Sequence, residues 1–109
     1  MTIRLPKPIA DYFAADQVVD ASAIADCFTP AAIVHNEGHT HAGRDAIRRW
    51  KDESSAKYTY TAEPISIASD GRQTVVNSHL VGDFPGSPVD LRYFFVLEDD
   101  KIAELEVVP

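Results

Sequence analysis

The sequence predicts an α+β fold, in which helices come first and a run of antiparallel strands follows. Apolar residues recur at helical spacing in the first half of the chain, and after Ser55 they alternate with a period of two. No internal repeat or linker divides the 109 residues. This length suits one hydrophobic core, so we expect a single domain over residues 1–109.

The first two helices are predicted from proline, capping and apolar spacing. Pro8 suits the first turn of a helix whose apolar face includes Tyr12. Asp20 is a good N-cap for a second helix. Thr29-Pro30 should end that helix, because the residue before a proline disfavours the helical conformation. The single cysteine, Cys27, has apolar neighbours and is expected to be a buried thiol.

A third helix is predicted to begin after Gly43. Its apolar stripe includes Ile47 and Trp50, at the spacing of one helical face. The charged residues expected to face water are Arg48, Arg49 and Lys51. This helix is the last one before the pattern changes.

The second half of the chain is predicted to form strands joined by tight turns. Pro64 interrupts the alternation of the first of them, which indicates a bulge or an edge strand. Asp70-Gly71 is typical of a hairpin turn. Turns at residues 85–88 and 99–100 bound a strand from Val89 to Glu98.

The strand from Val89 to Glu98 is apolar on both faces at its centre. Tyr93 and Phe95 alternate with Phe94 and Val96. One face should cover the helices, but the chain holds nothing further to cover the other. A second subunit is the simplest cover, so we expect a homodimer through the sheet.

Composition excludes several functions. A formal net charge of −7 and a pI near 4.8 argue against nucleic acid and against an anionic membrane surface, because both are bound through Lys and Arg. No apolar run approaches the roughly 20 residues that span a bilayer. One cysteine and no hydrophobic signal core favour a cytoplasmic location.

The segment His-Asn-Glu-Gly-His-Thr-His is the best candidate for a functional site. Four protonatable side chains occupy alternate positions, and they would share one face of an extended strand. These residues are His35, Glu37, His39 and His41. The alternative is that Gly38 lies in a loop, so that only one or two of them reach a pocket. We expect no metal, because alternate ligands from one strand rarely complete a tetrahedral set. A histidine here could act as a general base.

Several segments together resemble a known family. They are Tyr12, residues 20–28 with the following Ala-Ile-Val, Glu37-Gly38, residues 43–50, residues 82–89 and residues 101–107. In this order they resemble the SnoaL-like proteins and ketosteroid isomerases of the nuclear transport factor 2-like superfamily. The resemblance implies a cone, in which three helices close the concave face of a curved antiparallel sheet and leave a pocket.

The resemblance also implies where a site would lie. Isomerase-like members have an aspartate base at the end of the first short strand, and Asn36 occupies that position; an amide cannot serve as that base. Their oxyanion aspartate matches Phe94, and their donor tyrosine matches Tyr12. The family position of Trp50 is aromatic and borders the pocket. Ketosteroid isomerisation by the family's route is therefore not expected.

We expect a SnoaL-like domain that binds a small, largely apolar molecule in the cone pocket without a cofactor. The alternative is a cofactor-independent isomerase, cyclase, dehydratase or hydrolase. The candidate catalytic residues are His35, Glu37 and His79. The candidate ligand-binding residues are Tyr12, Asn36, His39, Trp50, Arg92 and Phe94.

Overall fold

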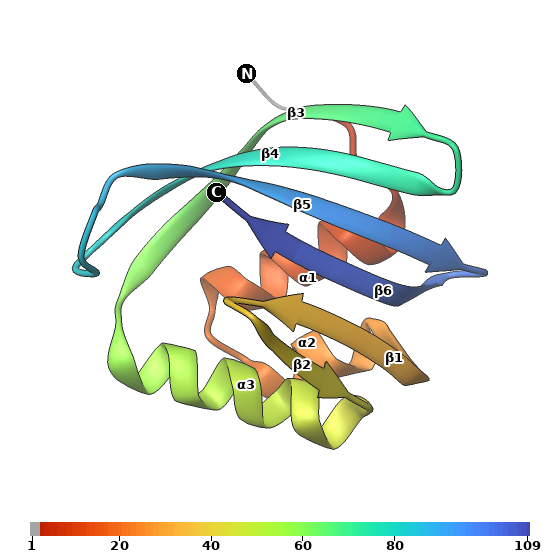
Figure 1. The fold of residues 1–109 in the computed structure, drawn as a ribbon, viewed down its shortest axis with the longest axis horizontal. Coiled ribbons are helices and arrows are strands. Elements are labelled where there is room, and N and C mark those ends of the chain that lie inside the picture. The colour runs from red at the N-terminus through yellow and green to blue at the C-terminus, as the bar shows by residue number, and fades with distance from the viewer. Residues whose placement is uncertain (1–2) are drawn as a thin grey trace.

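The computed structural model describes residues 3–109, and these residues form three helices and one six-stranded sheet (Figure 1). The helices are α1 (Lys7–Gln17), α2 (Ala21–Asp26) and α3 (Arg44–Lys57). The strands are β1 (Phe28–Asn36), β2 (His39–Ala42), β3 (Tyr60–Asp70), β4 (Gln73–Gly82), β5 (Val89–Glu98) and β6 (Lys101–Val108).

The strands lie in the order β2-β1-β6-β5-β4-β3, and the helices pack on one face of the curved sheet (Figure 1). The predicted α+β fold is confirmed. Neighbouring strands are antiparallel except for β1 and β6, which are parallel. The last strand thus lies between β1 and β5, in the middle of the sheet.

The core lies between the helices and the face of the sheet that they cover, here called the inner face. Tyr12 is fully buried, and its ring makes edge contacts with Phe28 and Phe95 at centroid distances of 6.0 and 5.8 Å. On β5, Tyr93 and Phe95 are buried on the inner face, whereas Phe94 lies half-buried on the outer face. The helices therefore cover the inner apolar face of β5, and nothing among residues 3–109 covers its outer apolar face.

Several local predictions are confirmed. The Asp20 carboxylate accepts a hydrogen bond from the backbone N–H of Ala23 at 3.0 Å and caps α2. The register of β3 against β4 shifts just after Pro64, as expected of a bulge. The turn that begins at Asp70 joins β3 to β4. Cys27 is a buried free thiol.

Two local predictions are wrong. Thr29-Pro30 does not end α2, which stops at Asp26; both residues belong to β1. The proline fits because the register of β1 against β6 is irregular between Phe28 and Ile33, where no regular ladder donor is required. Lys51 does not face water, because it lies one helical turn after the buried Ile47 and on the same face of α3.

The histidine segment forms a hairpin, because residues 39–42 add a strand that the sequence did not predict. Glu37 and Gly38 are the two turn residues, with positive φ angles of 52° and 77°. Two residues with positive φ are the geometry of a tight hairpin turn that matches the twist of the strands. Asn36 consequently pairs with His39, and His35 pairs with Thr40.

No helix among residues 3–109 has the length and the apolar character needed to cross a membrane. The longest one, α3, has 14 residues and exposes most of its charged side chains.

Candidate functional site

The hairpin divides the histidine segment between the two faces of the sheet. Directly opposed residues of an antiparallel pair share a face. His35 therefore lies with Thr40 on the outer face, whereas His39 and His41 lie with Asn36 on the inner face. The four alternating side chains do not converge. Within residues 3–109, no group of three or more His, Cys, Asp or Glu side chains is arranged to hold a metal ion.

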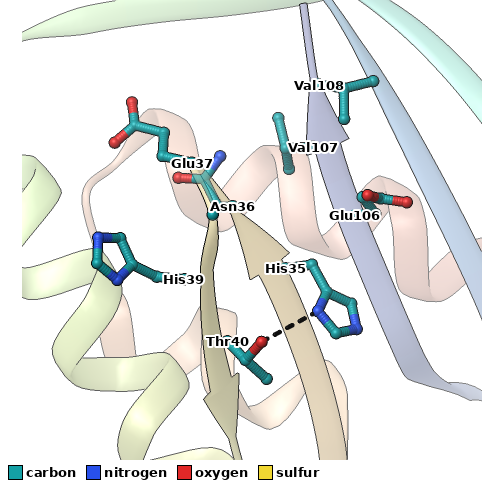
Figure 2. A pocket seen from close by; sticks show the side chains of 9 residues that line it. His35, Asn36, Glu37, His39, Thr40, Glu106, Val107 and Val108 are labelled. Carbon is teal, nitrogen blue, oxygen red and sulfur yellow. Dashed lines mark hydrogen bonds between the residues drawn. The ribbon is translucent and has the colours of Figure 1, made fainter.

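A cavity of about 240 Å³ lies where the β1–β2 turn meets the end of β6 (Figure 2). We call it the hairpin cavity. Its lining consists of residues 35–40 and 106–108. Four of the nine residues predicted for the site thus meet here. These are His35, Asn36, Glu37 and His39.

Most of the polar groups at the hairpin cavity lie near water. Glu37, His39 and Glu106 are exposed, and His35 is half-buried. His35 is hydrogen-bonded through Nδ1 to the Thr40 hydroxyl at 3.3 Å (Figure 2), and its Nε2 lies 3.6 Å from a carboxylate oxygen of Glu104. Their exposure makes these side chains accessible to a ligand from solvent.

Asn36 connects the hairpin cavity to the interior. Its side chain is on the inner face, and its Oδ1 accepts a hydrogen bond from Nε1 of Trp50 at 3.3 Å. Trp50 projects from α3 and is only 8% exposed. The imidazole of His41 stacks on the indole, with ring centroids 5.6 Å apart and an interplanar angle of 25°. Burial of that imidazole, and secondarily the nearby His39, lowers the pKa of His41.

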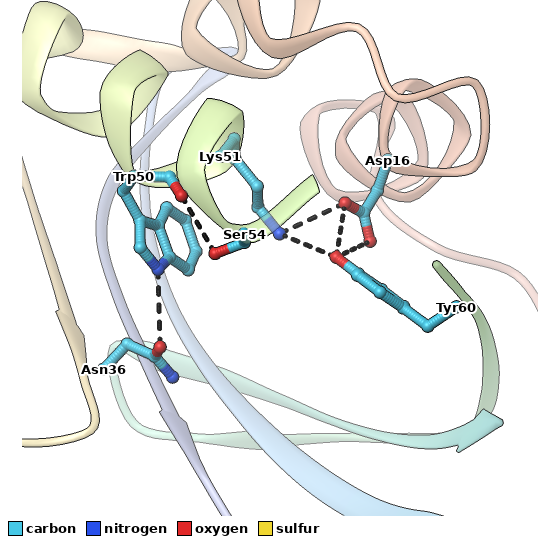
Figure 3. A network of polar contacts seen from close by, with 6 residues as sticks. All are labelled: Asp16, Asn36, Trp50, Lys51, Ser54 and Tyr60. Atoms are coloured by element: carbon cyan, nitrogen blue, oxygen red, sulfur yellow. Dashed lines mark hydrogen bonds and ion pairs between the residues drawn. The ribbon is translucent and has the colours of Figure 1, made fainter. Parts of the chain in front are cut away.

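A second polar cluster lies deeper, beneath α3 (Figure 3). Nζ of Lys51 donates hydrogen bonds to Oδ1 of Asp16 at 3.1 Å and to the hydroxyl of Tyr60 at 3.3 Å. The Tyr60 hydroxyl donates to the Asp16 carboxylate, 2.9 and 3.1 Å from its two oxygens. The side chains of Lys51 and Asp16 are 5% and 4% exposed. We call these three residues the interior network.

The pKa values of Lys51 and Tyr60 in the interior network are both raised. Burial alone would lower the pKa of Lys51, but the Asp16 carboxylate, Tyr60 and Tyr93 outweigh it, and the net pKa is raised. Burial raises the pKa of Tyr60, and Asp16 adds to that rise while Lys51 opposes it. The lysine is thus charged and the tyrosine neutral around neutral pH, so neither is a base or nucleophile there.

Tyr12 and Ser78 present buried hydroxyls without a hydrogen-bond partner among residues 3–109. The Tyr12 ring lies 5.2 Å from Nζ of Lys51, so its neighbour is the interior network. Tyr12 does not line the hairpin cavity, nor a larger, mostly apolar cavity of about 460 Å³ between α1 and β3. The structure therefore does not bring Tyr12 and the histidines to one cavity.

The remaining predicted site residues lie on the outer face of the sheet. His79 is on β4, separated from β1 by β6 and β5, and its Nδ1 lies 2.6 Å from the Asp90 carboxylate. Arg92 donates to the backbone oxygen of Pro109 at 3.1 Å, and Phe94 is its neighbour on the same face. These three residues face away from Tyr12 and from the helices.

Sequence reasoning missed the interior network. Its signal was present in the spacing, because Asp16 follows Tyr12 by four positions and Lys51 follows Ile47 by four. Each charged residue thus falls on the buried face of its helix. A charge at such a position predicts a buried partner of opposite sign, but the sequence does not say which residue that partner is.

Comparison with known proteins identifies the family. Residues 9–105 match the model of the SnoaL-like domain. No curated protein matches the chain. A structure from Sinorhizobium meliloti, described as a "putative polyketide cyclase", is 40% identical; the match covers 95% of each chain, with a TM-score of 0.90.

More distant structures share the fold. A Catenulispora acidiphila protein with a ketosteroid isomerase-like fold is 16% identical over 97% of this chain and 87% of its own, with a TM-score of 0.85. A cystatin-fold protein from Novosphingobium aromaticivorans is 17% identical over 99% and 100% of the two chains, with a TM-score of 0.79. With the family model covering almost the whole chain, this protein belongs to the SnoaL-like domain family.

Proposed function

We propose that this protein binds a small organic molecule in the hairpin cavity. The observation that carries the proposal is the convergence of four predicted site residues on one cavity, from both sides of a tight turn. Its volume of about 240 Å³ lies below the roughly 300–1,000 Å³ of pockets for drug-sized ligands. The size favours a ligand smaller than a drug molecule.

The lining of the hairpin cavity favours a ligand with hydrogen-bonding groups. Imidazole, amide, carboxylate and hydroxyl groups surround it, and its apolar contribution comes from Val107 and Val108. This lining differs from the largely apolar pocket that we expected from the sequence. A ligand with one polar group and a short apolar body would match both parts.

The proposal can be tested by fluorescence, because Trp50 is the only tryptophan and is hydrogen-bonded to the cavity residue Asn36. Titration with nitrobenzene, a small neutral quencher of indole emission, should give saturable quenching. Thr40→Phe places a bulky ring in the cavity lining and should weaken this quenching at least several-fold. Thr61→Phe is the matched control, since Thr61 is also an exposed strand threonine but lies on β3.

Two results would count against binding at this position. One is quenching that rises linearly with nitrobenzene and never saturates, which indicates collisions in solution. The other is saturable quenching that Thr40→Phe and Thr61→Phe leave equally strong, which would place the bound molecule elsewhere.

A second candidate is a cofactor-independent enzyme. It is favoured by the protonatable groups of His35 and Glu37 on one cavity, and by the 40% identical relative described as a "putative polyketide cyclase". For an isomerase or a cyclase, a carboxylate or imidazole would remove a proton from a carbon next to a carbonyl group and return it to carbon or oxygen. His79 lies three strands from β1 and would take no part.

Proton exchange tests the enzymatic candidate directly. The methyl protons of acetophenone should exchange with D₂O faster with the protein than with buffer alone, as followed by proton NMR. Glu37→Gln and His35→Gln should each slow this exchange, whereas Glu98→Gln, at the far end of β5, should not. Exchange no faster than in buffer would leave the binding function without catalysis, and exchange that survives both cavity substitutions would show that neither His35 nor Glu37 catalyses it.

We also propose that the outer face of the sheet joins two copies of the chain. Phe94 and Val96 are half-buried there, and the half-buried Val75 of β4 pairs with Phe94, so an apolar surface lies open. Phe94→Glu should convert a dimer to a monomer in solution scattering. Val18→Glu, on a valine that is 73% exposed after α1, should leave the mass unchanged. A wild-type protein with a monomer mass would contradict the dimer.

A cytoplasmic location remains a prediction from the sequence. The free and buried Cys27 thiol is compatible with a reducing compartment. Fractionation of the native cells, with an antibody to the protein, would test it.

A further inference from the structure

The amide of Asn36 is held in one orientation. An indole N–H can only donate a hydrogen bond, so the atom that faces Trp50 must be the amide oxygen. Figure 3 shows this contact, and Figure 2 shows the oxygen directed toward α3 with the nitrogen directed away from it. The two N–H donors of Nδ2 are therefore the groups that Asn36 offers to the hairpin cavity, which it lines.

The indole that orients Asn36 is itself fixed. Trp50 is buried, the Lys51 ammonium lies 4.4 Å from its ring centroid, and the His41 imidazole stacks on it. Lys51 is in turn fixed by Asp16 and Tyr60. A chain of contacts thus runs from the interior network through the indole to the amide. This arrangement preorganises the donor before any ligand binds.

The charges around the hairpin cavity favour a neutral partner for that donor. The carboxylates of Glu37 and Glu106 line the same cavity, and the whole chain has a formal net charge of −7. An anionic ligand would approach like charges, which costs Coulomb energy. A neutral carbonyl oxygen accepts a hydrogen bond without that cost.

We infer that Asn36, oriented by Trp50, selects neutral ligands that carry a carbonyl oxygen, which accepts a hydrogen bond from Nδ2. The inference rests on the proposed binding function and names the ligand chemistry of the same cavity. Asn36 contacts the ligand, and Trp50 is a positioning residue. The position where related isomerases hold a base thus becomes a donor that recognises oxygen.

Three probes that share one aromatic ring test the inference. Acetophenone carries a neutral carbonyl group, toluene lacks an acceptor, and benzoate is an anion. NMR titration of ¹⁵N-labelled protein would follow the backbone amides of residues 35–40 and the side-chain amide of Asn36. That signal is simple to assign, because the chain has four side-chain amides, those of Asn36, Asn77, Gln17 and Gln73. Acetophenone should bind about 3- to 10-fold more tightly than toluene, and benzoate should bind weakest.

Variants separate selectivity from folding. Asn36→Asp removes the donor but keeps an oxygen for Trp50, and it should abolish the preference for acetophenone over toluene. Asn77→Asp is the matched control, since the Asn77 amide donates to Ser66 at 2.8 Å on the outer face; it should keep the preference. Trp50→Phe frees the amide to turn and should reduce the preference even where toluene still binds.

The outcomes divide clearly. In one outcome, toluene or benzoate binds with the same affinity as acetophenone, as measured from the signals of residues 35–40. In that case the cavity binds ligands but Asn36 does not select them, and the inference is overturned. If none of the three probes shifts these signals, the proposed binding function fails and the inference fails with it. If Asn36→Asp does not fold, the wild-type preference and Trp50→Phe still decide.

Discussion

The interior network and the hairpin cavity are both polar regions next to α3, but they differ in whether their groups are partnered. Asp16, Lys51 and Tyr60 are mutually hydrogen-bonded; the two charged side chains are nearly inaccessible, and Tyr60 is half-buried. Around the hairpin cavity, Glu37 and His39 are exposed. A satisfied buried cluster holds elements in place, whereas polar groups that water can reach are available to a ligand.

The two regions should therefore have different roles, one in stability and one in binding. The interior network connects three elements, because its residues come from α1, α3 and the start of β3. The hairpin cavity lies at the edge of the sheet, where β1 and β2 turn. Substitutions in the interior network should therefore change stability, and substitutions at the hairpin cavity should change binding with little change in stability.

The largest effect is expected for Lys51→Met. It leaves the Asp16 carboxylate buried without its counter-ion and should destabilise the fold by about 3–5 kcal/mol in urea unfolding. Lys7→Met is the matched control, since Lys7 also pairs with an aspartate, Asp11, but both side chains are largely exposed. That variant should unfold like the wild type. Adding Asp16→Leu to Lys51→Met should restore much of the stability, because it removes the unpaired charge.

Alkaline pH should weaken the interior network, and acid pH should weaken the packing of His41 beside the hairpin cavity. The pKa values of Lys51 and Tyr60 are raised from 10.5 and 10.0, so their stabilisation is complete below these values and is lost as pH rises above them. The pKa of His41, on β2, is lowered from 6.5 by burial, so its contribution is present above that value and is lost as pH falls. Urea unfolding across pH should show alkaline loss that Tyr60→Phe reduces and acid loss that His41→Phe reduces. Equal pH dependence in both variants and the wild type would contradict this assignment.

Two tyrosines near the same lysine should respond in opposite directions. Tyr60→Phe removes a hydroxyl that donates to a buried carboxylate and should cost about 1.5–3 kcal/mol. Tyr12→Phe removes a buried hydroxyl that lacks a partner among residues 3–109, so it should stabilise the fold by about 1 kcal/mol. Thermal and urea unfolding of the two variants measure both effects. A Tyr12→Phe variant as destabilised as Tyr60→Phe would indicate that the Tyr12 hydroxyl has a partner.

The sequence predicted the fold well because its strongest signals are local. Asp20, Pro64 and Asp70-Gly71 each act through the backbone within a few residues, and the structure confirms all three. The prediction at Pro30 was wrong, because a proline can end a helix and can also fit an irregular strand. The local sequence is compatible with a helix end and with a strand at Pro30, and the pairing of β1 with the distant β6 favours the strand.

The candidate site was harder to predict, because it depends on side-chain direction across a turn. The alternation of His35, Glu37 and His39 assumed a continuous strand, but the positive φ angles of Glu37 and Gly38 reverse the chain between them. The pairing of Asp16 with Lys51 joins residues 35 positions apart, which no periodicity specifies. Spacing shows that each charge is buried, and the tertiary fold alone shows its partner.

The smallest effects are expected in the turn at the hairpin cavity. Gly38 has a φ of +77°, and a Cβ added there would meet no atom within 4 Å, so Gly38→Ala should cost only the backbone term of about 1 kcal/mol. Glu37→Asn should stabilise the fold by about 0.5 kcal/mol, since asparagine suits the first position of such a turn. Urea unfolding resolves the sign of both changes.

The same two variants also test the division between the regions through binding. Both substitutions act on the turn that positions the cavity lining, so each should change the nitrobenzene quenching of Trp50, whereas Lys7→Met should not. The opposite pattern is expected if the turn contributes to stability and not to binding. Glu37→Asn would then unfold more easily by several kcal/mol, as Lys51→Met does, and the quenching curve would stay the same. That result would make the hairpin part of the scaffold and remove the contrast with the interior network.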